Sequence, residues 1–132
     1  MSSHPIFVAL GSTPAAAAAA LYTNYLTTPS GVPVVGITAD AGLEIRSTDR
    51  SGTPGAATIN NPAGKVAIAL GAASVVVTNS LVTANSCILA TLNTTDATLL
   101  YIKSVVPGSG SFTITGNAVA TAGVKVSFLV FN

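Results

Sequence analysis

The chain has 132 residues, of which 49 % are hydrophobic and only 7 % are charged, and its net charge is +1. A soluble domain is about a quarter charged, so this composition excludes the basic surface of a nucleic-acid binder and long-range attraction to an anionic membrane. The length suits one compact domain. Because a low net charge favours association, the composition indicates a chain that covers much of its surface with other protein.

The first zone, about residues 1–30, contains a predicted strand at 5–10 and then an alanine-rich stretch at 14–26. Thr13 can cap a helix and Pro14 suits the first helical position, while alanine is the best helix former. The stretch therefore predicts a short amphipathic helix that docks on a sheet. The alternative is a low-complexity arm that becomes ordered on binding.

The middle zone, about residues 31–64, has two short strand candidates at 32–38 and 43–47. The rest of this zone is rich in proline and glycine, which predicts an extended loop or linker rather than a packed element. Together with the first zone it forms a predicted N-terminal arm, residues 1–62, that contacts a partner.

Five of the nine charged side chains lie in a short part of this middle zone. Their mixed signs suit ion pairs that fix the register of a partner subunit; the alternative is a solvated loop. Arginines interleaved with the carboxylates compete with a calcium ion for them, so surface ion pairs are the expected use. The candidate partner-contact residues are Asp40, Glu44, Arg46, Asp49 and Arg50.

From residue 63 onwards, short β-branched runs recur about every ten residues, separated by turn residues. Phe112 and Ile114 alternate with Thr113 and Thr115, which is the period of two expected of a half-buried strand. The run Pro-Gly-Ser-Gly at 107–110 predicts a tight hairpin turn. The strands predicted on these grounds are 66–70, 74–78, 87–93, 99–106, 111–115 and 125–131.

Short strands with regular turns and no helices between them are typical of a sandwich or barrel. The sequence therefore predicts an all-β fold, an antiparallel β-sandwich of jelly-roll type over residues 63–132, preceded by the arm with its short helix. The single cysteine, Cys87, lies in an apolar run and is expected to be a buried, inert thiol. The stretch 66–95 carries no charge, but Thr, Asn and Ser recur in it, so no membrane helix is predicted.

The chain has few residues of the types that form catalytic or metal sites. A Ser-His-Asp or Cys-His arrangement needs a histidine, and the only one is His4. Metal sites need clusters of His, Cys or carboxylates. A glycosidase would need two paired carboxylates, here two of Asp40, Glu44, Asp49 and Asp96, and the chain has no Trp to form a sugar platform. We therefore expect no enzymatic activity, no cofactor and no bound metal.

Five short segments of the last half of the chain are GKVAIA at 64–69, SVVVTNSLVT at 74–83, NTTDATL at 93–99, GSFTI at 110–114 and VKVSF at 124–128. In these segments the chain resembles a C-terminal β-module of bacteriophage virion proteins, which occurs in tail-fibre-like and capsid-decoration-like proteins. The resemblance covers about residues 60–132 and implies a non-enzymatic, trimeric virion component with no catalytic residues to transfer.

Residues and resemblance together predict a phage capsid decoration, or cement, protein. It is expected to form a homotrimer, to contact the major capsid protein, and to act at the capsid surface of the virion after synthesis in the host bacterial cytoplasm. No nucleic acid or membrane is expected among its partners. The alternative is a tail-fibre or head-fibre adhesin domain that binds host-surface glycan and needs exposed aromatic residues; the tyrosines are Tyr22, Tyr25 and Tyr101.

Overall fold

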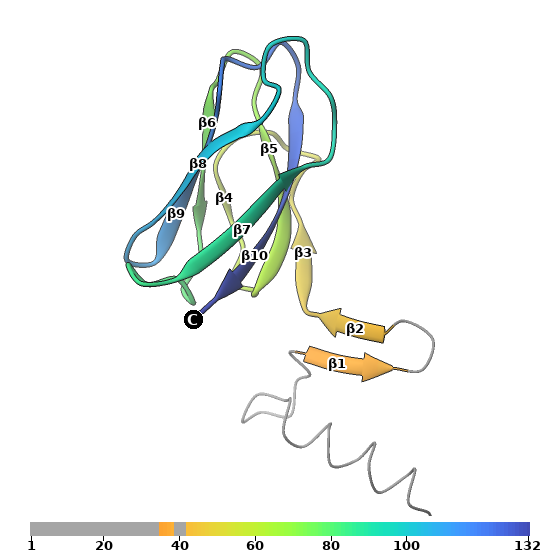
Figure 1. Ribbon diagram of the computed structural model, residues 1–132, viewed down its shortest axis with the longest axis vertical. Coiled ribbons are helices and arrows are strands. Elements are labelled where there is room, and N and C mark those ends of the chain that lie inside the picture. Colours follow the sequence, from red (N-terminus) through yellow and green to blue (C-terminus); the bar gives the residue numbers. More distant parts are fainter. Residues whose placement is uncertain (1–34, 39–41) are drawn as a thin grey trace, which may run out of the picture. The chain divides into compact units, whose positions relative to one another are not determined.

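The computed structural model describes residues 35–38 and 42–132 (Figure 1). The chain divides into two compact units, Met1–Arg46 and Ser47–Asn132. Every regular element among the described residues is a β-strand. The strand predicted at 5–10 and the helix predicted at 14–26 lie outside the described residues.

The described part of the first unit is a two-stranded antiparallel sheet. Its strands are β1 (Val35–Thr38) and β2 (Gly42–Ile45). The strands predicted at 32–38 and 43–47 are confirmed within these bounds.

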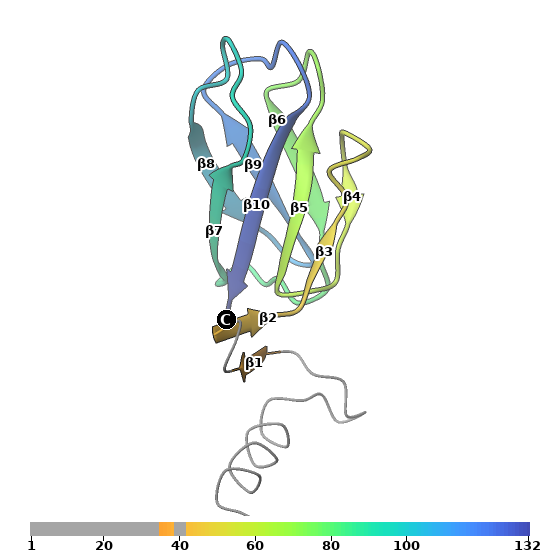
Figure 2. The same ribbon diagram turned by 90° about the vertical axis from the view of Figure 1, so that its right-hand side faces the viewer.

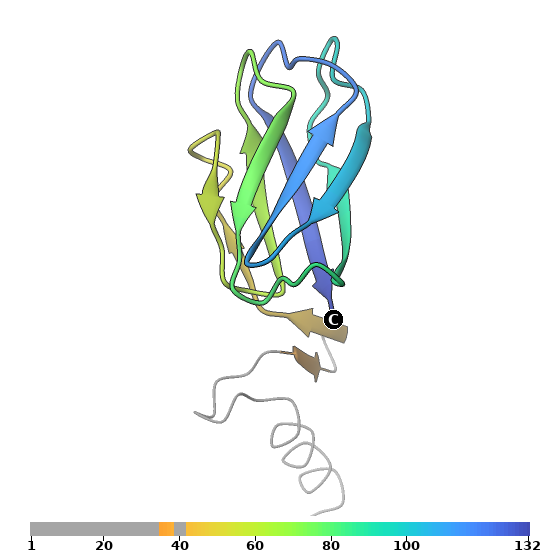
Figure 3. The same ribbon diagram turned by 90° about the vertical axis from the view of Figure 1, so that its left-hand side faces the viewer.

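The second unit is a sandwich of two four-stranded sheets, seen from three sides in Figures 1, 2 and 3. In the first sheet the strand order is β3-β5-β10-β7, and in the second sheet it is β4-β6-β9-β8. The prediction of a β-sandwich is confirmed. The strands are β3 (Ser47–Asp49), β4 (Ala57–Thr58), β5 (Ala63–Ile68), β6 (Ser74–Thr78), β7 (Cys87–Leu92), β8 (Ile102–Pro107), β9 (Ser111–Gly116) and β10 (Val124–Phe131).

Both sheets are mixed, so the prediction of a purely antiparallel sandwich is wrong. Three strands of each sheet pair antiparallel, but β3 runs parallel to β5 and β4 runs parallel to β6. These two edge strands come from the segment predicted as a loop, and with three and two residues they are too short to carry a periodic signal. The compact unit consequently begins at Ser47, earlier than the expected boundary at residue 63.

The predicted hairpin turn between β8 and β9 is confirmed. The two strands pair antiparallel on either side of it. The Gly108 N–H donates to the Ser111 carbonyl at 2.8 Å, and Gly110 has φ = 75°. A positive φ favours glycine because other residues carry a Cβ that clashes there.

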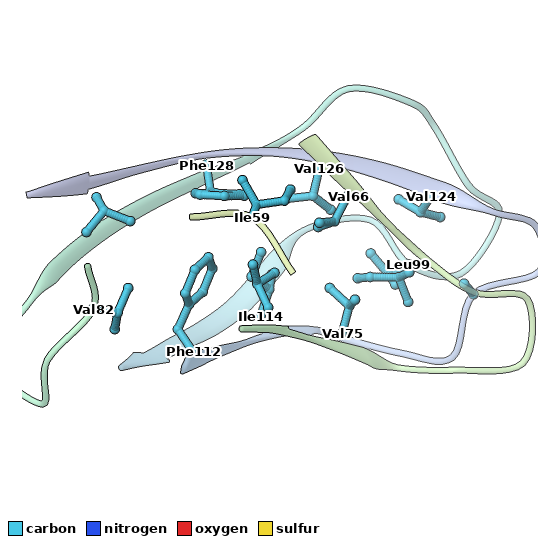
Figure 4. Close-up of a cluster of buried hydrophobic side chains, with 14 residues drawn as sticks. Ile59, Val66, Val75, Val82, Leu99, Phe112, Ile114, Val124, Val126 and Phe128 are labelled. Carbon is cyan, nitrogen blue, oxygen red and sulfur yellow. The ribbon is translucent and has the colours of Figure 1, made fainter. Parts of the chain in front are cut away.

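The core lies between the sheets and is filled by every second side chain of the inner strands (Figure 4). The rings of Phe112 on β9 and Phe128 on β10 meet edge to face, with centroids 4.9 Å apart. Leu99 is fully buried although it lies in a loop. Cys87 is exposed, so the prediction of a buried thiol is wrong: β7 is an edge strand, and Cys87 belongs to its outward-facing row.

The edge strand β3 sits tightly against β5 because residue 64 is glycine. A Cβ at Gly64 would lie 2.8 Å from the Thr48 carbonyl oxygen and 2.9 Å from the Phe128 ring. The first contact is backbone, which cannot rotate away. Gly52 in the following turn has no neighbour within 4 Å of the same position.

We therefore predict that Gly64→Ala lowers the free energy of unfolding by about 1–3 kcal/mol, the usual cost of overpacking. Urea denaturation followed by circular dichroism measures it. The matched control Gly52→Ala should stay within about 0.5 kcal/mol of the wild type. Equal stability of both variants would contradict the close packing of β3 on β5.

Candidate contact surfaces

The five residues predicted to contact a partner are distributed over both compact units. Glu44 in β2 and Arg46 belong to the first unit, while Asp49 and Arg50 at the end of β3 belong to the second. Asp40 lies outside the described residues, and the other four are exposed. Their role in fixing a partner's register stays a prediction.

Asp49 is engaged within its own turn. Its carboxylate accepts a hydrogen bond from the Ser51 hydroxyl at 2.7 Å and another from the Ser51 N–H at 2.8 Å. These bonds, the hydroxyl first, lower the pKa of Asp49, and the charges of Lys65 and Lys125 add to the shift. The carboxylate therefore shapes the turn after β3 and is held ionised beside two lysines of the same sheet.

Three long connections meet at one end of the sandwich, at the top of Figure 2. They are residues 69–73, 93–101 and 117–123, which follow β5, β7 and β9; we term this the loop end. Backbone bonds join the first and third connections, since Gly71 N–H donates to the Ala120 carbonyl at 2.9 Å and Ala120 N–H donates to the Ala72 carbonyl at 2.8 Å.

Six hydrogen-bond donors surround the carboxylate of Asp96, and the three on its Oδ2 tie the second connection to the third. Its Oδ1 accepts the N–H and hydroxyl of Thr98 and the N–H of Leu99 at 2.9–3.1 Å. Its Oδ2 accepts the N–H and hydroxyl of Thr121 and the N–H of Ala122 at 2.8–3.0 Å. These donors, the Leu99 N–H first, hold the pKa of Asp96 far below its usual range. A carboxylate with both oxygens so occupied is a structural tie rather than a free acid, base or metal ligand.

Asn117 forms a second tie between the same two connections. Its Oδ1 accepts the N–H groups of Leu100 at 2.7 Å and Tyr101 at 3.1 Å, and its Nδ2 donates to the Thr98 carbonyl at 3.1 Å. The single proton of the Thr98 hydroxyl is shared between Asp96 Oδ1 and the Val119 carbonyl, which is the nearer acceptor. The backbone of residues 98–101 is thus held to the third connection by both Asp96 and Asn117.

Large apolar and aromatic side chains are exposed on these fixed loops. The exposed fractions are 71 % for Leu70, 64 % for Leu100, 60 % for Tyr101 and 52 % for Val119. Single exposed apolar residues are common, but these four share three connections that hydrogen bonds hold together. We term them the apolar tip, and they are a candidate contact surface.

An open pocket of about 360 Å³ lies beside the apolar tip. Its size falls in the range of ligand pockets. Three of its four polar side chains already accept hydrogen bonds, with Thr95 as the exception: Asn93 Oδ1 accepts the Ser127 hydroxyl, Thr94 Oγ1 accepts the Lys125 N–H, and both oxygens of Asp96 are occupied. The pocket therefore suits an apolar group better than a sugar. It is lined by Leu92, Asn93, Thr94, Thr95, Asp96, Leu99 and Leu100.

Residues 35–38 and 42–132 contain no group of three or more His, Cys, Asp or Glu side chains that could hold a metal ion. No helix in that same part of the chain is long and apolar enough to cross a membrane. No family model matches the sequence, and comparisons with curated proteins and with solved structures give no match.

Sequence reasoning considered Asp96 only as one of four carboxylates for acid–base chemistry. Its structural use had a local signal, because an Asp side chain in a turn commonly accepts the backbone N–H two residues later, which is an Asx turn. The donors Thr121 and Ala122 come 25 and 26 residues later and gave no such signal. Leu100 and Tyr101 were placed in a strand from 99 to 106, but β8 begins at Ile102.

We predict that Asp96→Asn lowers the melting temperature by several degrees at pH 7. The substituted amide places a donor against donors at one of its two sites, so bonds that join the loops are lost. Asp49→Asn is the matched control, because Asp49 bonds only Ser51 in its own turn, and it should melt closer to the wild type. Differential scanning calorimetry measures all three proteins.

The same comparison has a defined pH dependence. The pKa of Asp96 is lowered in the folded state, so its contribution to stability is present above the ordinary carboxyl pKa of about 3.9 and is lost as the pH falls below it. The difference in melting temperature between the wild type and Asp96→Asn should therefore narrow between about pH 5 and pH 2. A difference that widens on acidification would contradict the assigned tie.

Proposed function

We propose that this chain is a non-enzymatic decoration, or cement, protein of a phage capsid, which self-associates as a homotrimer and stabilises the shell by contact with the major capsid protein. The observation that carries the proposal is the apolar tip, four exposed large side chains held on hydrogen-bonded loops. The phage assignment itself rests on the resemblance of residues 60–132 to virion β-modules.

Fixed loops suit a protein whose function is contact. Binding costs the ordering of side chains and loops at the interface, and the bonds made by Asp96 and Asn117 meet much of that cost during folding. Apolar area buried at roughly 25 cal/mol per Å² then adds to the cohesion of the shell. The chain's low content of charge leaves little desolvation to oppose it.

The strand order supports a jelly-roll assignment, which we propose as the finer class of the sandwich. Of the six strands from β5 to β10, the first pairs with the last and the second pairs with the fifth. Such nested pairing is that of a hairpin rolled into two sheets, an architecture that occurs in viral capsid domains. The strands that would complete the nest, β7 and β8, lie in different sheets. The first unit, residues 1–46 with its predicted helix, would reach across neighbouring capsid subunits.

A glycan-binding adhesin domain is the second candidate. Tyr101 favours it, because an aromatic ring that is 60 % exposed beside a pocket resembles a sugar platform. The engaged acceptors around the pocket argue against it, since sugars are held largely by free polar groups. Screening the full chain on an array of bacterial surface glycans separates the two roles.

The test of the proposed function is the position of the chain in a virion. Particles of the phage that encodes it should carry its density on the capsid surface by electron cryo-microscopy. Particles produced without the chain should lose that density and release their DNA at a lower temperature. Density at the tail, binding on the glycan array, or hydrolysis of host polysaccharide would each overturn the capsid role.

We predict that Leu100→Ser combined with Tyr101→Ala weakens capsid binding by tenfold or more, as loss of a hot spot of about 1.4 kcal/mol does. Both side chains are exposed to solvent in the wild type, so their substitution should leave the melting temperature unchanged. Val76→Ser, which removes a 43 % exposed side chain from β6 rather than from the loop end, should bind normally. The affinity of the wild type, the double variant and Val76→Ser is measured as the number of copies bound per capsid at rising protein concentration.

A further inference from the structure

We infer that β7 is a self-association edge, at which the β7 strands of two copies pair antiparallel across a two-fold axis and join their first sheets into one. The inference goes beyond the proposed homotrimer, because a two-fold contact cannot form a trimer and would instead join two trimers or two monomers in a pair. It needs no capsid for its test.

Three of the four edge strands of the described sandwich are protected against such pairing. Proteins protect sheet edges with short strands, charges, bulges and proline. Strands β3 and β4 have only three and two residues. Strand β8 carries Lys103, has a register shift between Ile102 and Ser104, and ends in Pro107.

Strand β7 has none of these protections. Its six residues, Cys-Ile-Leu-Ala-Thr-Leu, include no charge and no proline, and its register with β10 is unbroken. No strand among residues 35–38 and 42–132 pairs with its other side. Figure 2 shows β7 at the margin of the first sheet, with β10 on one side only.

The backbone groups on this free side can be assigned from the ladder. Asn93 N–H donates to the Lys125 carbonyl at 2.8 Å, on the β10 side. Because backbone groups alternate along an antiparallel ladder, Ile88, Ala90 and Leu92 direct their N–H and C=O groups away from β10. The side chains of these three residues are only partly buried against the core. The edge therefore offers a second strand both hydrogen-bond partners and apolar area.

A second copy is the occupant that the outer surface fits. Beside the free edge, Leu89 lies opposite Leu129 and Cys87 lies opposite Phe131. Leu89 is 57 % exposed and Phe131 is 49 % exposed. The four side chains carry no charge, so two identical copies meet without repulsion of like charges. A two-fold axis places the same patch against itself, as isologous contacts require.

The number of copies follows from the symmetry. A contact of β7 with β7 is two-fold, so it doubles whatever unit the other contacts form. It gives a dimer from a monomer and links two trimers where a three-fold contact also exists. A substitution that blocks β7 should therefore halve the mass in solution.

The test is sedimentation equilibrium of the full chain with Leu89→Lys. We expect the wild type at an even number of copies, two or six, and the variant at half that mass, because lysine on an edge strand opposes pairing. The control Val106→Lys alters a side chain that is 58 % exposed on the protected strand β8. Its mass should equal that of the wild type.

A second variant separates backbone pairing from side-chain contact. Ala90→Pro removes one N–H from the free side, where proline is tolerated on an edge strand, and should also halve the mass. Circular dichroism confirms that each variant is folded. A wild type of one or three copies, or an unchanged mass in Leu89→Lys and Ala90→Pro, would overturn the inference while leaving capsid binding standing. If the wild type has an even number of copies in solution but does not bind capsids, the β7 contact is supported and the proposed function is overturned.

Discussion

The alternation along β10 is the constraint on which the rest of the sandwich depends. This strand lies between β5 and β7, and its Val124, Val126, Phe128 and Val130 are buried against the second sheet. Because side chains alternate strictly in a strand, the register that buries this row also fixes what the opposite row shows. That outer row runs from Lys125 to the half-exposed Phe131. The apolar patch beside β7 is therefore a consequence of the same register that builds the core.

The longer strands could be predicted from the sequence because their burial has a period of two. The prediction at 74–78 matches β6 residue for residue, and its alternation of exposed and buried side chains is the signal itself. The short strands β3 and β4 gave no such signal, since two or three residues define no period. They are held by contacts distant in sequence, such as Thr48 against Gly64, which composition does not reveal. Cys87 was misjudged for a related reason: an apolar run on an edge strand exposes every second residue.

The loop end was the least predictable part, because its loops are held in place by hydrogen bonds between connections that lie far apart in the sequence. Thr98 and Leu99 are close to Asp96 in sequence, but Thr121 and Ala122 lie beside it because the pairing of β8 with β9 places the third connection alongside the second. The exposure of Leu100 and Tyr101 is decided in the same way, since Asn117 holds their backbone. Charge density guided the sequence-based choice of contact residues, whereas the loops of the loop end carry exposed apolar residues instead.

The edge strands of the sandwich differ in their protection against pairing. Strand β8 is protected, whereas β7 is not and has exposed apolar side chains beside it. Strand β8 carries a lysine, a bulge and a proline, and each of these opposes pairing with another strand. Such features indicate that uncontrolled pairing at this edge is harmful to the protein. The absence of such devices on β7 is therefore informative in a way that its hydrophobicity alone is not. With the loop end at the top of Figure 2 and β7 along one side, the two candidate surfaces use different parts of the sandwich. A protein that must bind both its own copies and an underlying shell requires that separation, because one surface cannot serve both partners at once.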